Sequence, residues 1–119
     1  MIEIKETSRE LTKVEKYLLT QSPELKSMKD VEDGRVCNVT AWVIFDDIKE
    51  ETGEVTTILS FMDDYKNSYN TNSATFIRSF KDIVNLFEAD DIIPVKKISG
   101  KSKNGRTYVN CVLDIDSMN

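Results

Sequence analysis

The chain has 119 residues, of which 39% are hydrophobic and 31% are charged, and its formal net charge is -5. This composition predicts one soluble globular domain, and no apolar run or signal-peptide core suggests a membrane or exported protein. The absence of histidine, the lack of a glycine-rich phosphate loop and the presence of only two cysteines argue against a metal site, nucleotide chemistry and a disulfide framework. We therefore expect a cytoplasmic protein with reduced core cysteines and with no catalytic residue, metal or cofactor.

The first 34 residues are predicted to form a helical N-terminal extension. Threonine and serine at positions 7 and 8 can cap a helix in which Leu11, Val14 and Leu18 recur at helical spacing. A short second turn and a glycine turn would follow. The apolar stripe of this helix is narrow, so it can cover the rest of the domain or dock onto a second copy, and the sequence leaves both alternatives open.

Three strands are predicted next. In the segment 35–46, the odd positions from 37 to 45 are small or apolar, and the even positions from 38 to 44 are polar or aromatic apart from Ile44. This alternation is typical of a half-buried antiparallel strand. An acidic loop, residues 46–54, leads to a second strand at about 55–62. The polar and aromatic stretch 65–72 predicts a short third strand.

The clearest predicted helix follows a cap at Ser73 or Thr75. It places Phe76, Phe80 and Phe87 on one broad apolar stripe. Two final strands, at about 92–100 and 106–116, flank an asparagine–glycine pair at positions 104 and 105. That pair is the strongest short signal for a two-residue β-hairpin turn.

This order of elements predicts a mainly-β fold with helices. Specifically, it favours a five-stranded Greek-key barrel of the oligonucleotide/oligosaccharide-binding (OB) type, with a helix between strands three and four. The helical extension would comprise residues 1–34 and the barrel residues 35–119, as one domain overall. An open antiparallel sheet with helices on one face is the alternative.

Charge is distributed unevenly along the chain. Between Ile92 and Leu113 there are five basic residues and no acidic residue, which leaves -10 for the rest of a chain whose net charge is -5. A basic hairpin on an acidic body predicts a surface that binds polyanions. Lysines that merely deter pairing between sheet edges are the alternative. The five basic residues are Lys96, Lys97, Lys101, Lys103 and Arg106.

Proteins that bind single-stranded nucleic acid combine aromatic side chains, which stack on bases, with a basic groove that follows the backbone. Packing beneath the N-terminal helix is the alternative role for Trp42, whereas the asparagine-rich surroundings of Tyr65 and Tyr69 favour contact with a ligand. The predicted nucleic-acid-binding residues are Trp42, Tyr65, Lys66, Tyr69, Arg78, Lys101, Lys103, Arg106 and Tyr108.

The acidic loop argues against a simple version of this site. Residues 46–54 contain five carboxylates and one lysine, so they should repel DNA. In OB barrels the loop between the first two strands usually borders the ligand groove. The nucleic acid would then pass on the hairpin side only, or the loop would serve a protein partner.

Three stretches of the sequence, residues 7–19, 22–31 and 98–108, resemble a group of small single-stranded DNA-binding OB proteins of Gram-positive phages and conjugative plasmids. The resemblance covers most of the chain. It implies coating of single strands in the cytoplasm of a bacterial host, during DNA replication or conjugative transfer. It also implies assembly along the strand and no enzymatic activity. The chain lacks the acidic-tipped glycine- and proline-rich tail of the common bacterial single-strand binders, which puts recruitment of host repair proteins through such a tail in doubt.

We therefore predict a non-catalytic, largely sequence-independent single-stranded DNA-binding protein of a phage or mobile element. RNA is a further candidate ligand, and the N-terminal helix is the candidate surface for oligomer formation. The alternative function is a protein-interaction module that binds or inhibits a host protein, including by mimicry of nucleic acid. The acidic loop and the net negative charge motivate that alternative.

Overall fold

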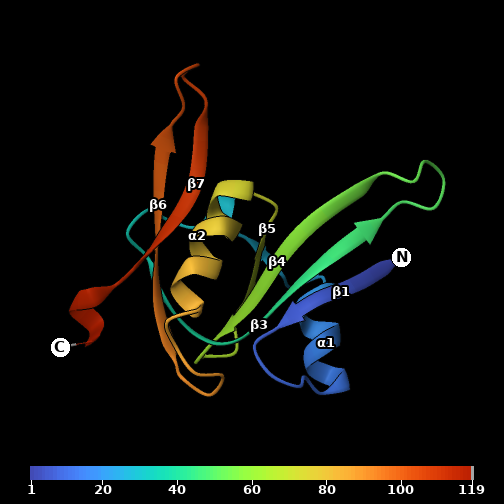
Figure 1. Ribbon diagram of the computed structural model, residues 1–119, viewed down its shortest axis with the longest axis horizontal. Coiled ribbons are helices and arrows are strands. Elements are labelled where there is room, and N and C mark those ends of the chain that lie inside the picture. Colours follow the sequence, from blue (N-terminus) through green and yellow to red (C-terminus); the bar gives the residue numbers. More distant parts are fainter. Residues whose placement is uncertain (119) are drawn as a thin grey trace.

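Seven strands form one strongly curled sheet, with one helix across its middle and a second helix near the N-terminus (Figure 1). The computed structural model describes residues 1–118. The strands are β1 (Ile2–Thr7), β2 (Lys26–Ser27), β3 (Val36–Ile48), β4 (Val55–Asp63), β5 (Ser68–Thr71), β6 (Ile93–Lys101) and β7 (Thr107–Leu113). The helices are α1 (Lys13–Thr20) and α2 (Ala74–Val84), with short 3-10 turns η1 (Met28–Asp30) and η2 (Ile115–Met118).

The long strand β3 organises the sheet. The strand order is β2-β5-β4-β3-β6-β7, with β1 added to β3 outside this path. One edge of β3 pairs with β4, while its other edge pairs first with β6, through residues 36–39, and then with β1, through residues 43–47. The β2–β5 pair is parallel and the others are antiparallel. A single 13-residue strand therefore supports most of the domain.

The predicted five-stranded barrel is wrong. The described residues form a seven-stranded sheet whose path ends at β2 and β7, so the sheet curls but does not close. The position of β2 explains the opening, because this two-residue strand occupies the edge of β5 on which a closing strand would pair. Across the opening, Ser73 Oγ donates to the carbonyl oxygen of Val109 on β7 at 3.0 Å.

The predicted helical N-terminal extension is also wrong. Residues Ile2–Thr7 form β1 on the edge of β3. The period-two alternation of Ile2 and Ile4 with charged residues is the signal for this strand, and the sequence prediction overlooked it. Ser8 then continues the ladder, because its N–H donates to the carbonyl oxygen of Trp42 and the N–H of Trp42 donates to its Oγ, both at 3.0 Å.

Helix α1 starts later than predicted, at a capping box. Thr12 Oγ1 accepts from the N–H of Glu15 at 3.1 Å, and the Glu15 carboxylate accepts from the N–H of Thr12 at 2.9 Å. The Arg9 guanidinium donates to the same carboxylate at 2.7 and 3.0 Å. Together these hydrogen bonds, that of Arg9 foremost, lower the pKa of Glu15 to about 2.

The core has two parts, one on each side of β3. The larger part lies under α2, where Phe61 stacks against Phe76 at 6.3 Å and against Phe80 at 5.8 Å. The smaller part lies under α1 and includes Leu19. Burying each such side chain contributes about 1.5–3 kcal/mol. The predicted apolar face of the first long strand, from position 37 to 45, is fully buried.

Both cysteines are buried free thiols in the larger core. Burial raises the pKa of Cys37 to about 11 and that of Cys111 to about 12. At neutral pH these groups remain protonated, so they act as small apolar side chains. Among residues 1–118, no helix combines the length and apolar character needed to span a bilayer.

Candidate nucleic-acid interface

The β6–β7 hairpin projects from the body of the sheet at the top of Figure 1. Its loop differs from the predicted two-residue turn. The N–H of Gly105 donates to the carbonyl oxygen of Ser102 at 2.9 Å, and the N–H of Ser102 donates to that of Arg106 at 2.8 Å. The loop is therefore three residues long, and Gly105 has a φ of 78°. This geometry is that of a type I turn followed by a glycine bulge.

Two of the five basic residues in this segment serve internal contacts. Lys96 Nζ lies 3.6 Å from Asp114. Lys97 is buried, with its Nζ 3.4 Å from Asp33 and hydrogen-bonded to the carbonyl oxygen of Val31. The other three are exposed and form no ion pair among the described residues, which leaves them available to a ligand: Lys101, Lys103 and Arg106.

A groove of about 720 Å³ opens where the sheet fails to close, between β5 and the β6–β7 hairpin. Its lining is rich in amide and hydroxyl groups, and it contains the exposed Lys29 and the ring of Tyr108. The three free cations do not line the groove. They lie on the adjoining tip of the hairpin, since Arg106 directly precedes Thr107 and Lys101 pairs with Thr107. We call this the hairpin groove; it is lined by Ser27, Lys29, Ile58, Asn70, Thr71, Asn72, Ser73, Lys97, Ser99, Thr107, Tyr108 and Val109.

The ring of Tyr108 lies against Gly100, which leaves space for it because glycine has no side chain. The two residues are paired across the hairpin. A Cβ atom at position 100 would lie 2.5 Å from the hydroxyl oxygen of Tyr108 and 2.6 Å from its Cζ, so only glycine leaves room for the ring. The tyrosine side chain is 37% exposed and lines the groove, so it is available to stack on a base.

Tyr69 faces the core instead of the solvent. It is 1% exposed, and its ring packs on Phe61 at 5.5 Å. Its hydroxyl group donates to Asp63 and accepts from Arg35, both at 3.4 Å. Burial raises the pKa of Tyr69. Stacking of this ring on a base would require β5 to open, because the ring packs β5 against the core.

Trp42 lies under α2 rather than under the N-terminal helix. Its ring meets that of Phe80 edge-on, with centroids 5.8 Å apart. It lines a hollow of about 150 Å³ together with Glu88 and Asp91, whose carboxylates disfavour a phosphate. The structure therefore places Trp42 away from the hairpin groove.

Tyr65 and Lys66 form the turn between β4 and β5. The buried Asp63 holds this turn, because its carboxylate accepts from the N–H of Tyr65 at 3.0 Å and from that of Asn67 at 2.8 Å. Tyr65 is 82% exposed as a result. Lys66 lines a separate hollow of about 340 Å³ together with Lys26. This turn precedes β5, whereas the hairpin groove lies at the other end of that strand.

Arg78 lies on α2 in a second groove, of about 660 Å³, between this helix and the start of β4. It is exposed and has no ion pair among the described residues. Its neighbour Lys81 lies 2.7 Å from Glu6.

The structure thus groups Lys101, Lys103, Arg106 and Tyr108 and places Arg78 in an adjacent groove. Sequence reasoning missed Lys29, Asn70 and Asn72, although the asparagine-rich stretch was a signal for a polar groove wall.

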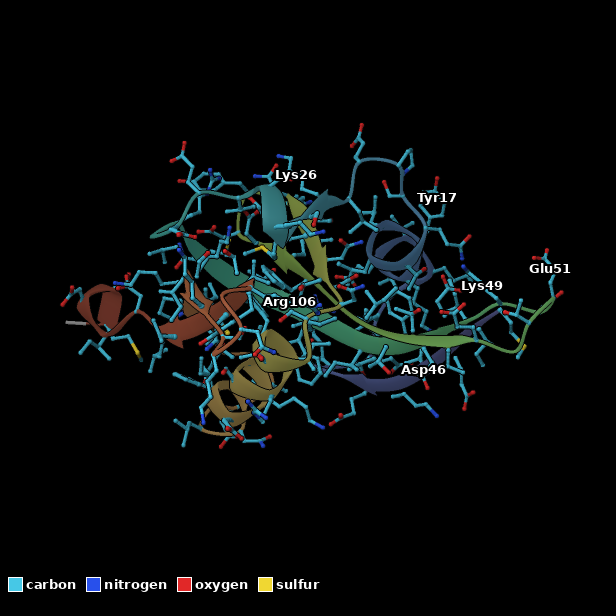
Figure 2. All side chains as sticks on the ribbon, turned by 90° about the horizontal axis from the view of Figure 1, so that it is seen from above. Tyr17, Lys26, Asp46, Lys49, Glu51 and Arg106 are labelled. Carbon is cyan, nitrogen blue, oxygen red and sulfur yellow. The ribbon has the colours of Figure 1, made fainter. Side chains whose placement is uncertain are left out.

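The acidic loop lies apart from the hairpin groove. Figure 2 shows Lys49 and Glu51 at the far end of the β3–β4 hairpin, whereas Arg106 lies over the middle of the molecule. None of residues 46–54 lines the hairpin groove. Among residues 1–118, no group of three or more cysteine, aspartate or glutamate side chains is placed to hold a metal ion.

Comparison with known protein families finds a match over most of the chain. Residues 4–114 match the family of phage single-stranded DNA-binding proteins, phi29 type. Comparison with curated proteins and with solved structures finds no match. The family match confirms the predicted binding of single-stranded DNA by a phage protein, whereas the link to conjugative plasmids stays a prediction. The match spans nearly the whole chain, and the chain belongs to the phage single-stranded DNA-binding protein family.

Proposed function

We propose that this protein coats phage single-stranded DNA during replication, with little preference for base sequence, and that the strand lies in the hairpin groove. The observation that carries this proposal is an open groove lined by the ring of Tyr108, on a hairpin whose adjoining tip carries three cations without ion pairs among the described residues. Phosphate contacts and stacking carry little sequence information, because every nucleotide offers both a phosphate and a ring face.

The energetics favour binding that salt weakens. Each base stacked on an aromatic ring contributes ~1–3 kcal/mol. Three phosphates contacted by Lys101, Lys103 and Arg106 would lower the logarithm of the binding constant by about 2 for each tenfold rise in salt, since each contact contributes about 0.7. The acidic remainder of the chain opposes this attraction, so a bound strand can be released readily.

Assembly along the strand is the second part of the proposal. Helix α1 buries Leu19 in the smaller core but leaves Val14 67% exposed and Tyr17 50% exposed. Figure 2 shows Tyr17 on the outer side of α1. A neighbouring copy bound to the same strand would cover these two apolar side chains. Replacing both with glutamate should then abolish cooperative binding to long strands while leaving binding to a strand that holds one copy unchanged.

Fluorescence anisotropy of a labelled strand of about 30 nucleotides tests the proposal at low and at physiological salt. Duplex DNA and single-stranded RNA of the same length serve as comparisons. We expect tight, salt-sensitive binding to the single DNA strand and weak binding to the duplex, while the RNA titration shows whether the 2′-hydroxyl matters. Absence of binding to the single DNA strand at low salt would contradict the proposal.

A further inference from the structure

We infer that the bound strand continues from the hairpin groove over Asn72 into the second groove, where Arg78 receives a phosphate. This inference rests on the proposed function, because it extends the same strand along the surface. It assigns a second subsite for single-stranded DNA on the outer face of α2. Its consequence is that Arg78 matters only for strands long enough to reach it.

The two grooves are contiguous. Asn72 lines both of them, and on β4 the adjacent Thr57 and Ile58 line one groove each. At the start of α2, Ser73 lines the hairpin groove and Ala74 lines the second groove. The residues that line the shared boundary are therefore small polar or apolar side chains. One carboxylate touches it: Asp46 accepts a hydrogen bond from Thr57 Oγ1 at 2.8 Å, and Lys5 lies 3.6 Å from the same carboxylate and offsets its charge.

The second groove offers a nucleotide both an apolar floor and a cation. Val55 is 53% exposed, and it lines the groove beside Ile77. A base can lie on this apolar surface while Arg78 binds its phosphate, because the guanidinium group has no competing carboxylate within ion-pair distance among the described residues. Lys81 in the same groove is held by Glu6 at 2.7 Å, and Asp82 adds an opposing charge.

The test is the dependence of affinity on strand length for matched variants. Oligothymidylates of about 4 to about 16 nucleotides cover the range of site sizes seen in comparable single-strand binders. The variants are Arg78→Ala, Lys81→Ala as the control in the same groove, and the double variant Lys101→Ala/Lys103→Ala for the hairpin. Circular dichroism confirms that each variant is folded.

We expect Arg78→Ala to leave the affinity for the shortest strand unchanged and to lower that for the longest strand by about 3- to 10-fold. Its salt slope should fall by about 0.7 for the long strand only. Lys81→Ala should change little, and Asp82→Asn should improve binding of long strands only. An Arg78→Ala variant that matches Lys81→Ala at every length would overturn the inference, and so would an equal loss at every length. Normal binding by the hairpin variant would instead contradict the proposed function.

Discussion

The β3–β4 and β6–β7 hairpins are built alike but carry opposite charges. Both project from the sheet as antiparallel pairs, and both turn at a glycine with positive φ, 72° at Gly53 and 78° at Gly105 (Figure 1). The first carries five carboxylates and one lysine over residues 46–54, whereas the second carries three free cations at its tip. We call the tip of the β3–β4 hairpin, residues 46–54, the acidic arm, and the tip of the β6–β7 hairpin, residues 101–106, the basic arm. The net charge of -5 is a poor guide to the ligand, because the fold places the opposite charges on these two separate arms.

The two arms also differ in what lies at their base. The basic hairpin contributes Thr107, Tyr108 and Val109 to the hairpin groove. The acidic hairpin contributes the start of β4, residues 55–57, to the second groove, although residues 46–54 line neither groove. On the proposed path, a strand would meet the aromatic ring and the cations first and would approach the acidic hairpin only in the second groove.

The largest expected effect comes from reversing charge on the basic arm. Lys101→Glu/Lys103→Glu should weaken binding to single-stranded DNA by about 10- to 100-fold at low salt and reduce the salt slope by about 1.4, because two phosphate contacts are lost. Anisotropy titrations at several salt concentrations measure both quantities. Lys13→Glu/Lys16→Glu on α1 makes the same change in net charge. An equal loss of DNA affinity in the two double variants would show that net charge alone matters. It would contradict a specific role for the basic arm.

The next effect concerns the ring beside the basic arm. Tyr108→Ala should cost ~1–3 kcal/mol of binding free energy, whereas Tyr65→Ala, which removes an exposed ring outside the groove, should cost little. Gly100→Ala should reduce affinity by displacing the same ring. The double variant Gly100→Ala/Tyr108→Ala should bind no worse than Tyr108→Ala alone, because the two changes remove one contact. Additive losses would show that Gly100 does not act through Tyr108.

A smaller gain is expected from neutralising the acidic arm. Glu50→Gln/Glu51→Gln/Glu54→Gln should raise affinity about 2- to 5-fold at low salt and leave it unchanged at high salt, because these exposed charges act at long range and are screened. Titrations at about 0.01 M and about 0.3 M salt would show this. Weaker binding by the triple variant would mean that the arm contacts the strand or a second copy favourably.

The smallest effect on binding is expected from a site near neither arm. Glu15 has its pKa lowered to about 2 in the folded protein, against an ordinary value of 4.5. A lowered pKa stabilises the fold above the ordinary value, and this contribution disappears as the pH falls from about 5 towards 2. Glu15→Gln should therefore lower the free energy of unfolding by ~1 kcal/mol at pH 7. Near pH 2 the variant and the unaltered protein should be equally stable. DNA affinity at pH 7 should not change. Urea denaturation across this pH range measures the difference, and a constant difference at all pH values would exclude the ionised carboxylate as its cause.

Local patterns in the sequence were enough to predict the elements around the site. The alternation at positions 37 to 45 and the phenylalanine stripe of α2 reflect burial on one face, and the charge asymmetry located the basic hairpin. These features depend on neighbours within a few residues, so a single sequence reveals them. The acidic loop was likewise predicted to repel DNA, and residues 46–54 line neither of the two large grooves.

Closure of the sheet and the direction of single side chains were not predictable in the same way. Whether β7 meets β5 depends on the two-residue β2, which has almost no sequence signal of its own. The inward direction of Tyr69 follows from its pairing with Phe61, 8 residues earlier in the chain. The sequence placed Lys97 in a run of basic residues available to a ligand. In the structure its Nζ instead donates to backbone carbonyl oxygens of residues more than 60 positions away.

The most direct test of the central claim is an amide-resolved NMR titration with a short oligothymidylate. We predict that the backbone signals of residues 99–109 and 70–73 shift together as the strand is added, because they surround the hairpin groove, while those of residues 47–54 do not. Shifts that concentrate on the acidic arm or at the β4–β5 turn, with the hairpin unaffected, would contradict the account.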